Sequence, residues 1–246
     1  MKKFLPCDDG THHLPFAVVN HFTCGGIAIG ACISHKLADG SSFINFMKNW
    51  AATARCESVE ALKAKYVESS TGLELYPSRN RYVTTTDQVE SESEKLHIIL
   101  YVVNLRRRMN PPLPDCSFGN LFQLIPAIVS KETSQEDWYG IVHKLRDAKR
   151  KLDKFDLDLV KEFSGKVMAP DTVVSTFSGL CGFPRYDVNF GWGKPLWIGR
   201  VSLPHKNLIT LTDTKFGDGI EAWINLKEEE MVKFEKDKEL LSYARI

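Results

Sequence analysis

A histidine and an aspartate stand four positions apart in the segment His35-Lys36-Leu37-Ala38-Asp39-Gly40. The histidine follows an apolar run typical of a strand, and Gly40 permits a tight turn into a helix. An imidazole at a strand end can take a proton from a hydroxyl or an amine near neutral pH. Asp39 has two open roles: it orients the imidazole, or it points away and holds the turn by pairing with an arginine. The turn is the main candidate for general-base chemistry.

Two further segments combine unusual residues. In Asn189-Phe190-Gly191-Trp192-Gly193-Lys194-Pro195, two glycines flank a tryptophan, which is typical of a shaped loop with a buried tryptophan anchor. In the other segment, Asn104 and three arginines at 106–108 precede the proline-rich run 111–114 and then Phe118-Gly119-Asn120. That pattern indicates a strand end followed by a stiff loop, with the arginines solvated or structurally paired.

Several classes of protein are disfavoured. A net charge of +1, from 32 basic and 31 acidic residues, argues against nucleic-acid binding. We find no phosphate-binding glycine loop, no nucleophile elbow and no metal-ligand spacing. The longest apolar stretch, 24–33, contains three glycines and is too short to span a membrane. No signal peptide opens the sequence, and the six cysteines form no C-x-x-C pair, so we expect partly buried, reduced thiols in a cytoplasmic protein.

The main candidate turn needs a strand before it and a helix after it. Residues 16–33 read as strand material, and Gly25-Gly26 suggests a bulge or a close backbone approach. Ser41 and Ser42 are candidate helix caps. After them, one apolar helical face is expected at Phe43, Phe46, Met47 and Trp50.

The rest of the chain predicts an α/β or an α+β architecture. Residues 55–95 show no sustained period, whereas 96–103 reads as a strand buried on both faces. Further strands are expected at 121–129 and 173–177, and an antiparallel pair at 209–212 and 220–226. A capping box at 134–137 opens a helix with an apolar face at 138, 141, 142, 145 and 152, and three glutamates at 228–230 begin a final helix. The sheet is expected to be mixed or largely antiparallel.

Taken together, these motifs resemble the plant BAHD acyltransferases, in particular the alkaloid-acylating, vinorine synthase-like branch. The H-x-x-x-D-G match is His35, Asp39 and Gly40, and the lead-in N-x-F-x-C-G-G is matched at 20–26. The D-F-G-W-G loop is matched at 190–193, the N-x-R-x-R…P-P-L-P…G-N stretch at 104–120, and a C-terminal segment at 218–223. Matches in the same order over most of the chain are more specific than any one motif alone.

The resemblance implies an α/β chloramphenicol-acetyltransferase-like fold of two domains with a channel between them. It divides the chain into an incomplete first domain at 1–75, a crossover at 76–95 and a second domain at 96–246. His35 would deprotonate a small-molecule alcohol or amine, which attacks acyl-CoA directly, and Asp39 would pair with an arginine at 106–108. CoA-side residues would be Ser175, Phe190, Gly191, Trp192 and Gly193. Acyl-CoA is then a cosubstrate, and no permanently bound cofactor, metal, membrane or nucleic acid is implied.

Three departures from the family pattern leave a second interpretation open. Asn189 replaces an aspartate, so an ion pair expected there is lost, and Phe177 stands where a tryptophan N–H would hold an oxyanion. Only 34 residues precede His35, and the spacing from Asp39 to Asn104 is also short for the family. Members are usually monomeric, but exposed apolar surface would here favour self-association and low stability. The alternative is an impaired remnant that binds CoA or a related subunit without turnover.

Overall fold

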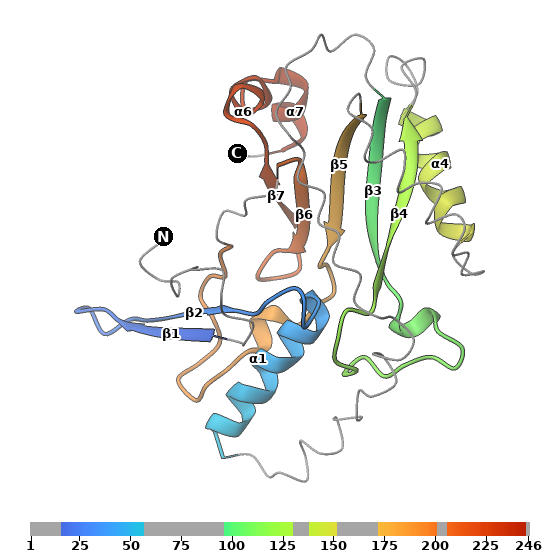
Figure 1. The fold of residues 1–246 in the computed structure, drawn as a ribbon. Helices are drawn as coiled ribbons and strands as arrows, with labels where there is room; N and C mark the ends of the chain where they lie inside the picture. Colours follow the sequence, from blue (N-terminus) through green and yellow to red (C-terminus); the bar gives the residue numbers. More distant parts are fainter. Residues whose placement is uncertain (1–15, 57–95, 130–137, 152–171, 201–205, 245–246) are drawn as a thin grey trace. The chain divides into compact units, whose positions relative to one another are not determined.

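A computed structural model describes residues 16–56, 96–129, 138–151, 172–200 and 206–244 (Figure 1). The chain divides into two compact units. The first comprises 1–82, 104–123 and 182–201, and the second comprises 83–103, 124–181 and 202–246. Residues 104–123 and 182–201 thus group with the N-terminal part, whereas the motif-based division places them in the second domain. The boundaries at 75 and 95 lie outside the described residues and stay a prediction.

The described part of the first unit begins with an antiparallel hairpin. Strand β1, Phe16–His21, pairs with β2, Ile27–Cys32, with Phe16 opposite Cys32 and His21 opposite Ile27. Both strands agree with the sequence pattern, but the glycine pair lies in the connecting turn and forms no bulge. Gly25 has a φ of +83°, which glycine adopts without steric cost, and its N–H donates to the carbonyl of Phe22 over 2.9 Å.

Helix α1, Gly40–Ala54, follows the candidate turn, but two details differ from expectation. Its N-cap is Asp39, which has the extended backbone of a cap and whose carboxylate accepts the N–H of Ser42. Its buried face is Ser41, Ser42, Ile44, Ala51 and Ala52, while the expected apolar residues 43, 46, 47 and 50 are only half-buried. Small side chains on the buried face leave room for the neighbouring loop to approach the helix closely.

That neighbouring loop begins with a 3-10 turn, η3, Arg106–Arg108, and continues to residue 121. The amide of Asn45 on α1 donates to the carbonyl of Asp115 over 2.8 Å. Arg107 also pairs with Asp115 through two hydrogen bonds, and the bonding from the guanidinium lowers the pKa of that carboxyl. Helix and loop are therefore joined at this end by polar contacts at the surface. A second 3-10 turn, η4, Arg185–Asp187, begins the glycine–tryptophan segment.

The second unit contains a five-stranded sheet in the order β4-β3-β5-β6-β7. Strand β3 (Leu96–Asn104) pairs in parallel with β5 (Thr172–Gly179), and β5 with β6 (Leu208–Asp213). Strand β7 (Ile220–Asn225) is antiparallel to β6, as its alternating pattern predicts. The mixed sheet is confirmed. Strand β4 (Phe122–Val129) lies at the edge, where Pro126 is tolerated because an edge strand can leave one side of its ladder unpaired.

Among the described residues of the second unit, three helices accompany the sheet: α4 (Trp138–Lys151), α6 (Glu228–Phe234) and α7 (Lys238–Tyr243). Figure 1 shows α4 beside the edge strand β4. On the expected apolar face of α4, Ile141 and Leu145 are half-buried, but Val142 is exposed. The capping box at 134–137 lies outside the described residues. Within the described ranges, none of the helices has the length and apolar character that crossing a membrane requires.

The cysteines differ from expectation in exposure. Five of the six lie in the part of the chain that the structure describes, and no disulfide joins any two of these five. Four of them, Cys24, Cys32, Cys56 and Cys181, are exposed instead of partly buried. The reason is local, because they lie in turns or at the ends of elements and not in strand or helix interiors.

Candidate active site

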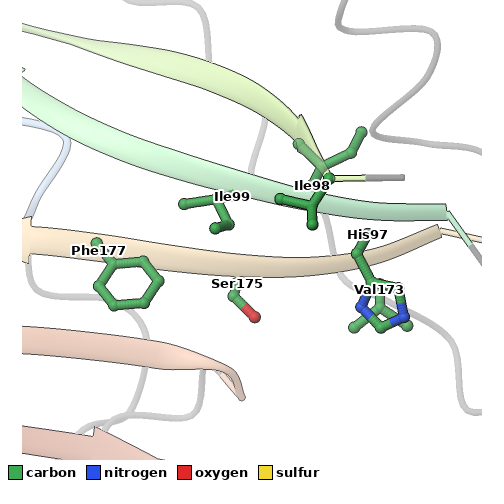
Figure 2. Close-up of a pocket in the computed structure, with 7 residues that line it drawn as sticks. His97, Ile98, Ile99, Val173, Ser175 and Phe177 are labelled. Carbon is green, nitrogen blue, oxygen red and sulfur yellow. The ribbon is translucent and has the colours of Figure 1, made fainter. Parts of the chain in front are cut away.

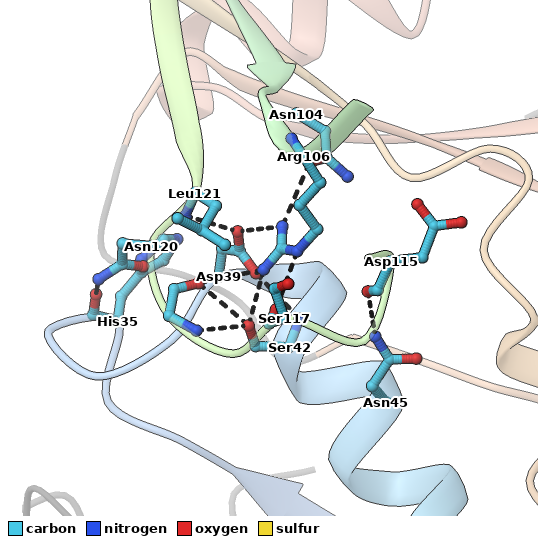
Figure 3. Close-up of polar contacts among 11 residues, drawn as sticks. His35, Asp39, Ser42, Asn45, Asn104, Arg106, Asp115, Ser117, Asn120 and Leu121 are labelled. Carbon is cyan, nitrogen blue, oxygen red and sulfur yellow. Dashed lines mark hydrogen bonds and ion pairs between the residues drawn. The ribbon is translucent and has the colours of Figure 1, made fainter. Parts of the chain in front are cut away.

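The carboxylate of Asp39 is the centre of a buried polar cluster in the first unit (Figure 3). Its Oδ1 accepts the N–H of Ser42 at 2.9 Å and Nη2 of Arg106 at 3.0 Å. Its Oδ2 accepts Nη1 of Arg106 at 2.8 Å and the N–H of Leu121 at 3.0 Å. Each oxygen thus accepts two donors, so the carboxylate is fully used in joining the turn, helix α1 and the 104–121 loop.

Arg106 has no exposed side-chain surface and forms a bidentate ion pair with Asp39. Its Nε donates to the carbonyl of Ser117 over 2.9 Å, and Nη1 also reaches Oδ1 of Asn104 at 3.2 Å. The implied pairing of Asp39 with an arginine of the 106–108 cluster is confirmed, and Arg106 is the partner. A buried guanidinium is tolerated because its donors meet a carboxylate and several oxygens in fork geometry.

Ser42 connects this ion pair to the Phe118–Leu121 segment. Its Oγ accepts Nη2 of Arg106 at 2.9 Å and the N–H of Gly119 at 3.0 Å, and it donates to the carbonyl of Gly119 over 3.0 Å. Gly119 has a φ of +128°, which strongly favours glycine. The sequence indicates Ser42 only as a candidate helix cap, and its spacing three residues after Asp39 is the one signal that points to a larger role.

The imidazole of His35 is placed differently from the Asp39 carboxylate. His35 is exposed, and its ring meets the edge of Phe122 at a centroid distance of 5.5 Å and an angle of 70°. Its backbone carbonyl accepts Nδ2 of Asn120 at 2.7 Å. Within the described part of the chain, the imidazole nitrogens make no hydrogen bond, to Asp39 or to any other group. Of the two roles open for Asp39, the structure therefore supports the one that holds the turn.

The glycine–tryptophan loop packs against α1 through aromatic rings. Phe190, only 9% exposed, meets Trp50 edge-on at 4.8 Å and stacks on Trp192 at 5.6 Å. Trp192 is 61% exposed, so the buried anchor is Phe190 and not the expected tryptophan. A phenylalanine carries no polar group and can be buried in this loop at no hydrogen-bonding cost, unlike an indole.

Asn189 organises the same loop. Its Oδ1 accepts the N–H groups of Gly191 at 2.9 Å and Gly193 at 3.1 Å. Both glycines have positive φ, +110° and +113°. The neutral amide therefore supplies the acceptor for two backbone donors in this turn.

Ser175 lies in the second unit, on β5. It lines a pocket of about 240 Å³ on the sheet (Figure 2). Ser175 is opposite Ile99 in the parallel register, and His97 is opposite Val173. Apart from Ser175 and His97, the lining is apolar: Ile98, Ile99, Val129, Val173 and Phe177. Ser175 and the 190–193 loop belong to different units, and their roles toward CoA stay a prediction.

The described residues hold no cluster of three or more His, Cys, Asp or Glu side chains that could bind a metal. The cluster around Asp39 is built on one carboxylate, paired with Arg106. The chemistry that the arrangement supports is proton transfer by an accessible imidazole.

Known proteins that are similar to this chain cover most of its sequence. The model of the Transferase family matches residues 1–90 and 81–241. Akuammiline synthase 1 from Alstonia scholaris is 33% identical over 93% of this chain and 67% of its own length. Vinorine synthase from Rauvolfia serpentina is 31% identical over 89% of the chain and 63% of its own, and limonoid 7-O-acetyltransferase from Citrus sinensis is 30% identical over 95% and 67%. The chain thus spans about two thirds of the length of these relatives.

Solved structures give the fold. The crystal structure of vinorine synthase matches with a TM-score of 0.76 and 27% identity, covering 93% of this chain and 65% of that one. TRI101 from F. sporotrichioides, solved with coenzyme A and T-2, matches with a TM-score of 0.65 at 14% identity, over 94% and 68% of the two chains. The expected chloramphenicol-acetyltransferase-like fold is confirmed. With the family model covering nearly the whole sequence, the chain belongs to the Transferase family, the BAHD acyltransferases.

Proposed function

We propose that this protein transfers an acyl group from acyl-CoA to a hydroxyl or amine of a small plant specialised metabolite, with His35 as general base. The observation that carries the proposal is the different hydrogen bonding of Asp39 and His35 in the HxxxD turn. The carboxylate of Asp39 accepts hydrogen bonds from Arg106, Ser42 and Leu121. The exposed imidazole of His35 makes no hydrogen bond within the described ranges. An imidazole in that state is available to accept a proton from a substrate.

With the His35 imidazole as base, the proposed acyl transfer is direct. The imidazole removes the proton of the acceptor hydroxyl or amine as its oxygen or nitrogen attacks the thioester carbonyl carbon. The tetrahedral intermediate then expels the CoA thiolate, and the imidazolium returns the proton to the sulfur. The carbon–sulfur bond is exchanged for a carbon–oxygen or carbon–nitrogen bond, with no acyl-enzyme and no net change at His35. A positioned base of this kind contributes about 10²–10⁴-fold to the rate.

Asp39 acts in this proposal by holding the turn. It caps α1 and pairs with Arg106, so its removal acts first on the stability of the turn and only through it on proton transfer.

CoA is proposed to use Ser175 and the loop residues Phe190, Gly191, Trp192 and Gly193. In support of this cosubstrate, two proteins of the same fold were solved with coenzyme A and with ethyl coenzyme A.

The substrate class is proposed from the relatives. Their names include an akuammiline synthase, a stemmadenine O-acetyltransferase, limonoid O-acetyltransferases and an N-malonyltransferase. Both oxygen and nitrogen acceptors therefore occur among proteins similar to this chain, and an alkaloid-like alcohol is the acceptor we favour.

A second candidate is an impaired member that binds CoA without turnover. It is favoured by the span of about two thirds of the relatives' length and by Phe177, which offers no N–H to an oxyanion. Calorimetric CoA binding without release of free thiol would support this candidate over the transferase.

The deciding experiment measures free CoA thiol released from acetyl-, malonyl- and longer acyl-CoAs with alcohol and amine acceptors. His35→Ala is expected to lower kcat by about 10²–10⁴-fold, since the base is lost. His21→Ala is the matched control, because His21 is also an exposed histidine of the first unit and lies at the end of β1. Full activity of His35→Ala would show that the base lies elsewhere.

A further inference from the structure

Three consecutive residues, Gly119, Asn120 and Leu121, join the 104–121 loop to the turn that carries His35. Gly119 and Leu121 use their backbones: the Gly119 carbonyl accepts the N–H of Asp39 at 3.3 Å, and the Leu121 N–H donates to the Asp39 carboxylate over 3.0 Å. Asn120, between them, uses its side chain, whose Nδ2 donates to the His35 carbonyl over 2.7 Å. Figure 3 shows this amide directed at His35, on the side of the cluster away from Asn45.

The loop is held without Asn120. Asp39 and Ser42 already anchor its backbone at Gly119 and Leu121 through hydrogen bonds of 3.0 to 3.3 Å. The hydrogen bond to His35 is the one that the Asn120 side chain makes among the described residues. What this side chain adds is therefore a constraint on His35 and not on the loop.

The carbonyl oxygen of the Asn120 amide also indicates that this side chain acts on His35. Its Oδ1 is buried and has no hydrogen-bond partner within the described ranges. The orientation of the amide follows from the bond to His35, because a reversed amide would place two oxygens against each other. A buried acceptor without a donor costs stability, so this asparagine is a poor choice for a purely structural purpose.

We propose that Asn120 is a positioning residue for His35: its amide fixes the His35 peptide, and Phe122, two residues later, fixes the ring. Phe122 is the first residue of β4 and Asn120 lies in the loop just before it, so both contacts come from the short segment that enters this strand. Together they constrain the Cα–Cβ direction and the ring plane of an imidazole that makes no hydrogen bond within the described part of the chain. This inference rests on the proposed role of His35 as general base.

The expected effect is on turnover. A displacement of about 1 Å at a reacting group can cost on the order of 10²-fold in rate. Asn120→Ala is therefore expected to lower kcat by about 10- to 100-fold, with the KM for acyl-CoA nearly unchanged, because the loss falls on the transition state. Its melting temperature is expected to stay close to that of the unchanged chain, since the mutation also removes the unpaired Oδ1.

Asn45→Ala is the matched control. It deletes the same kind of bond, from an asparagine amide to a backbone carbonyl, between α1 and the same loop at 2.8 Å, but at Asp115 and not at His35. It should leave kcat unchanged. A second readout needs no turnover: the rate at which diethyl pyrocarbonate acylates His35, followed by peptide mass spectrometry, should rise in Asn120→Ala and not in Asn45→Ala.

The outcomes separate the two proposals. If Asn120→Ala and Asn45→Ala have the same kcat and the same His35 labelling rate while His35→Ala is inactive, the positioning role is overturned and the proposed function stands. If His35→Ala keeps full activity, the proposed function itself fails. If the chain shows no turnover with any donor, the labelling rates alone decide, and equal rates in the two asparagine variants overturn the inference.

Discussion

Replacing Asp39 by alanine tests whether the buried ion pair holds the HxxxD turn. The substitution removes four hydrogen bonds to the carboxylate, two of them from Arg106. Arg106 then keeps its positive charge with no exposed side-chain surface and no carboxylate beside it. An uncompensated buried charge of this kind costs about 3–5 kcal/mol of unfolding free energy. That is a large fraction of the roughly 5–15 kcal/mol available to a typical domain.

Part of the unfolding free energy lost in Asp39→Ala comes from the helix cap. Asp39 is the N-cap of α1, and loss of such a cap costs about 1 kcal/mol. Asparagine is as good a cap as aspartate but carries no charge. Asp39→Asn should therefore be less destabilising than Asp39→Ala by about 1 kcal/mol, while both leave the charge of Arg106 unpaired.

Urea unfolding followed by tryptophan fluorescence is the assay, since Trp50, Trp192 and Trp197 all belong to the first unit. With a slope of about 2–3 kcal/mol per molar, the Asp39→Ala midpoint should fall by about 1–2.5 M. Arg106→Met in the Asp39→Ala background removes the stranded charge, so the double variant should be much less unstable than the sum of the single variants. Additive losses, or a loss below about 1 kcal/mol for Asp39→Ala, would refute the reasoning.

Two further predictions concern the segment 187–194. Asn189→Ala removes the acceptor for the N–H groups of Gly191 and Gly193 and should speed limited proteolysis of this loop, whereas Asn189→Asp, which keeps an oxygen there, should not. The Lys194 hydrogen bond lowers the pKa of Asp187, so this pair contributes stability above the unfolded-state pKa of the carboxyl and loses it as pH falls through the lower folded-state value. Because both side chains are at least half-exposed, Asp187→Asn should change the unfolding free energy near neutral pH by less than about 1 kcal/mol, and should change it less in acid. A larger change that persists in acid, measured by urea unfolding, would contradict the ion-pair origin.

Local patterns predict most of the elements. The β6–β7 pair follows from strict alternation, and α6 begins at the three glutamates that suit a helix N-terminus. The parallel neighbours of β5 could not be predicted in this way. Pairing of β5 with β3 and β6 depends on how residues far apart in the chain fold back, and an apolar run carries no information about which strand it will pair with.

The candidate site could be predicted in part. The motif order points to His35, Asp39 and the 106–108 arginines, and the Asp39–Arg106 pair is confirmed by the structure. The choice of Arg106 over its two neighbours stays open in the sequence, because three successive arginines differ in burial only once the 3-10 turn η3 directs one of them inward.

Ser42 and Asn120 show what residue type alone cannot reveal. Ser42 reads as an ordinary cap candidate, yet its hydroxyl bonds Arg106 and Gly119, which lie 64 and 77 positions away in the chain. Asn120 reads as a loop residue, yet it reaches the carbonyl of His35 across 85 positions. Neither separation leaves a periodic signal in the sequence.

The sequence by itself determined which segments become strands and helices, and which residues could carry acyl-transfer chemistry. Those properties depend on nearest neighbours: alternation, helical spacing, capping and turn residues. Only the tertiary structure decided which of the three arginines pairs with Asp39, that Phe190 and not Trp192 is the buried anchor, and that α1 buries mainly small residues. Each of these is settled by which partner meets a side chain after folding, because burial and hydrogen bonding are properties of contacts between distant segments.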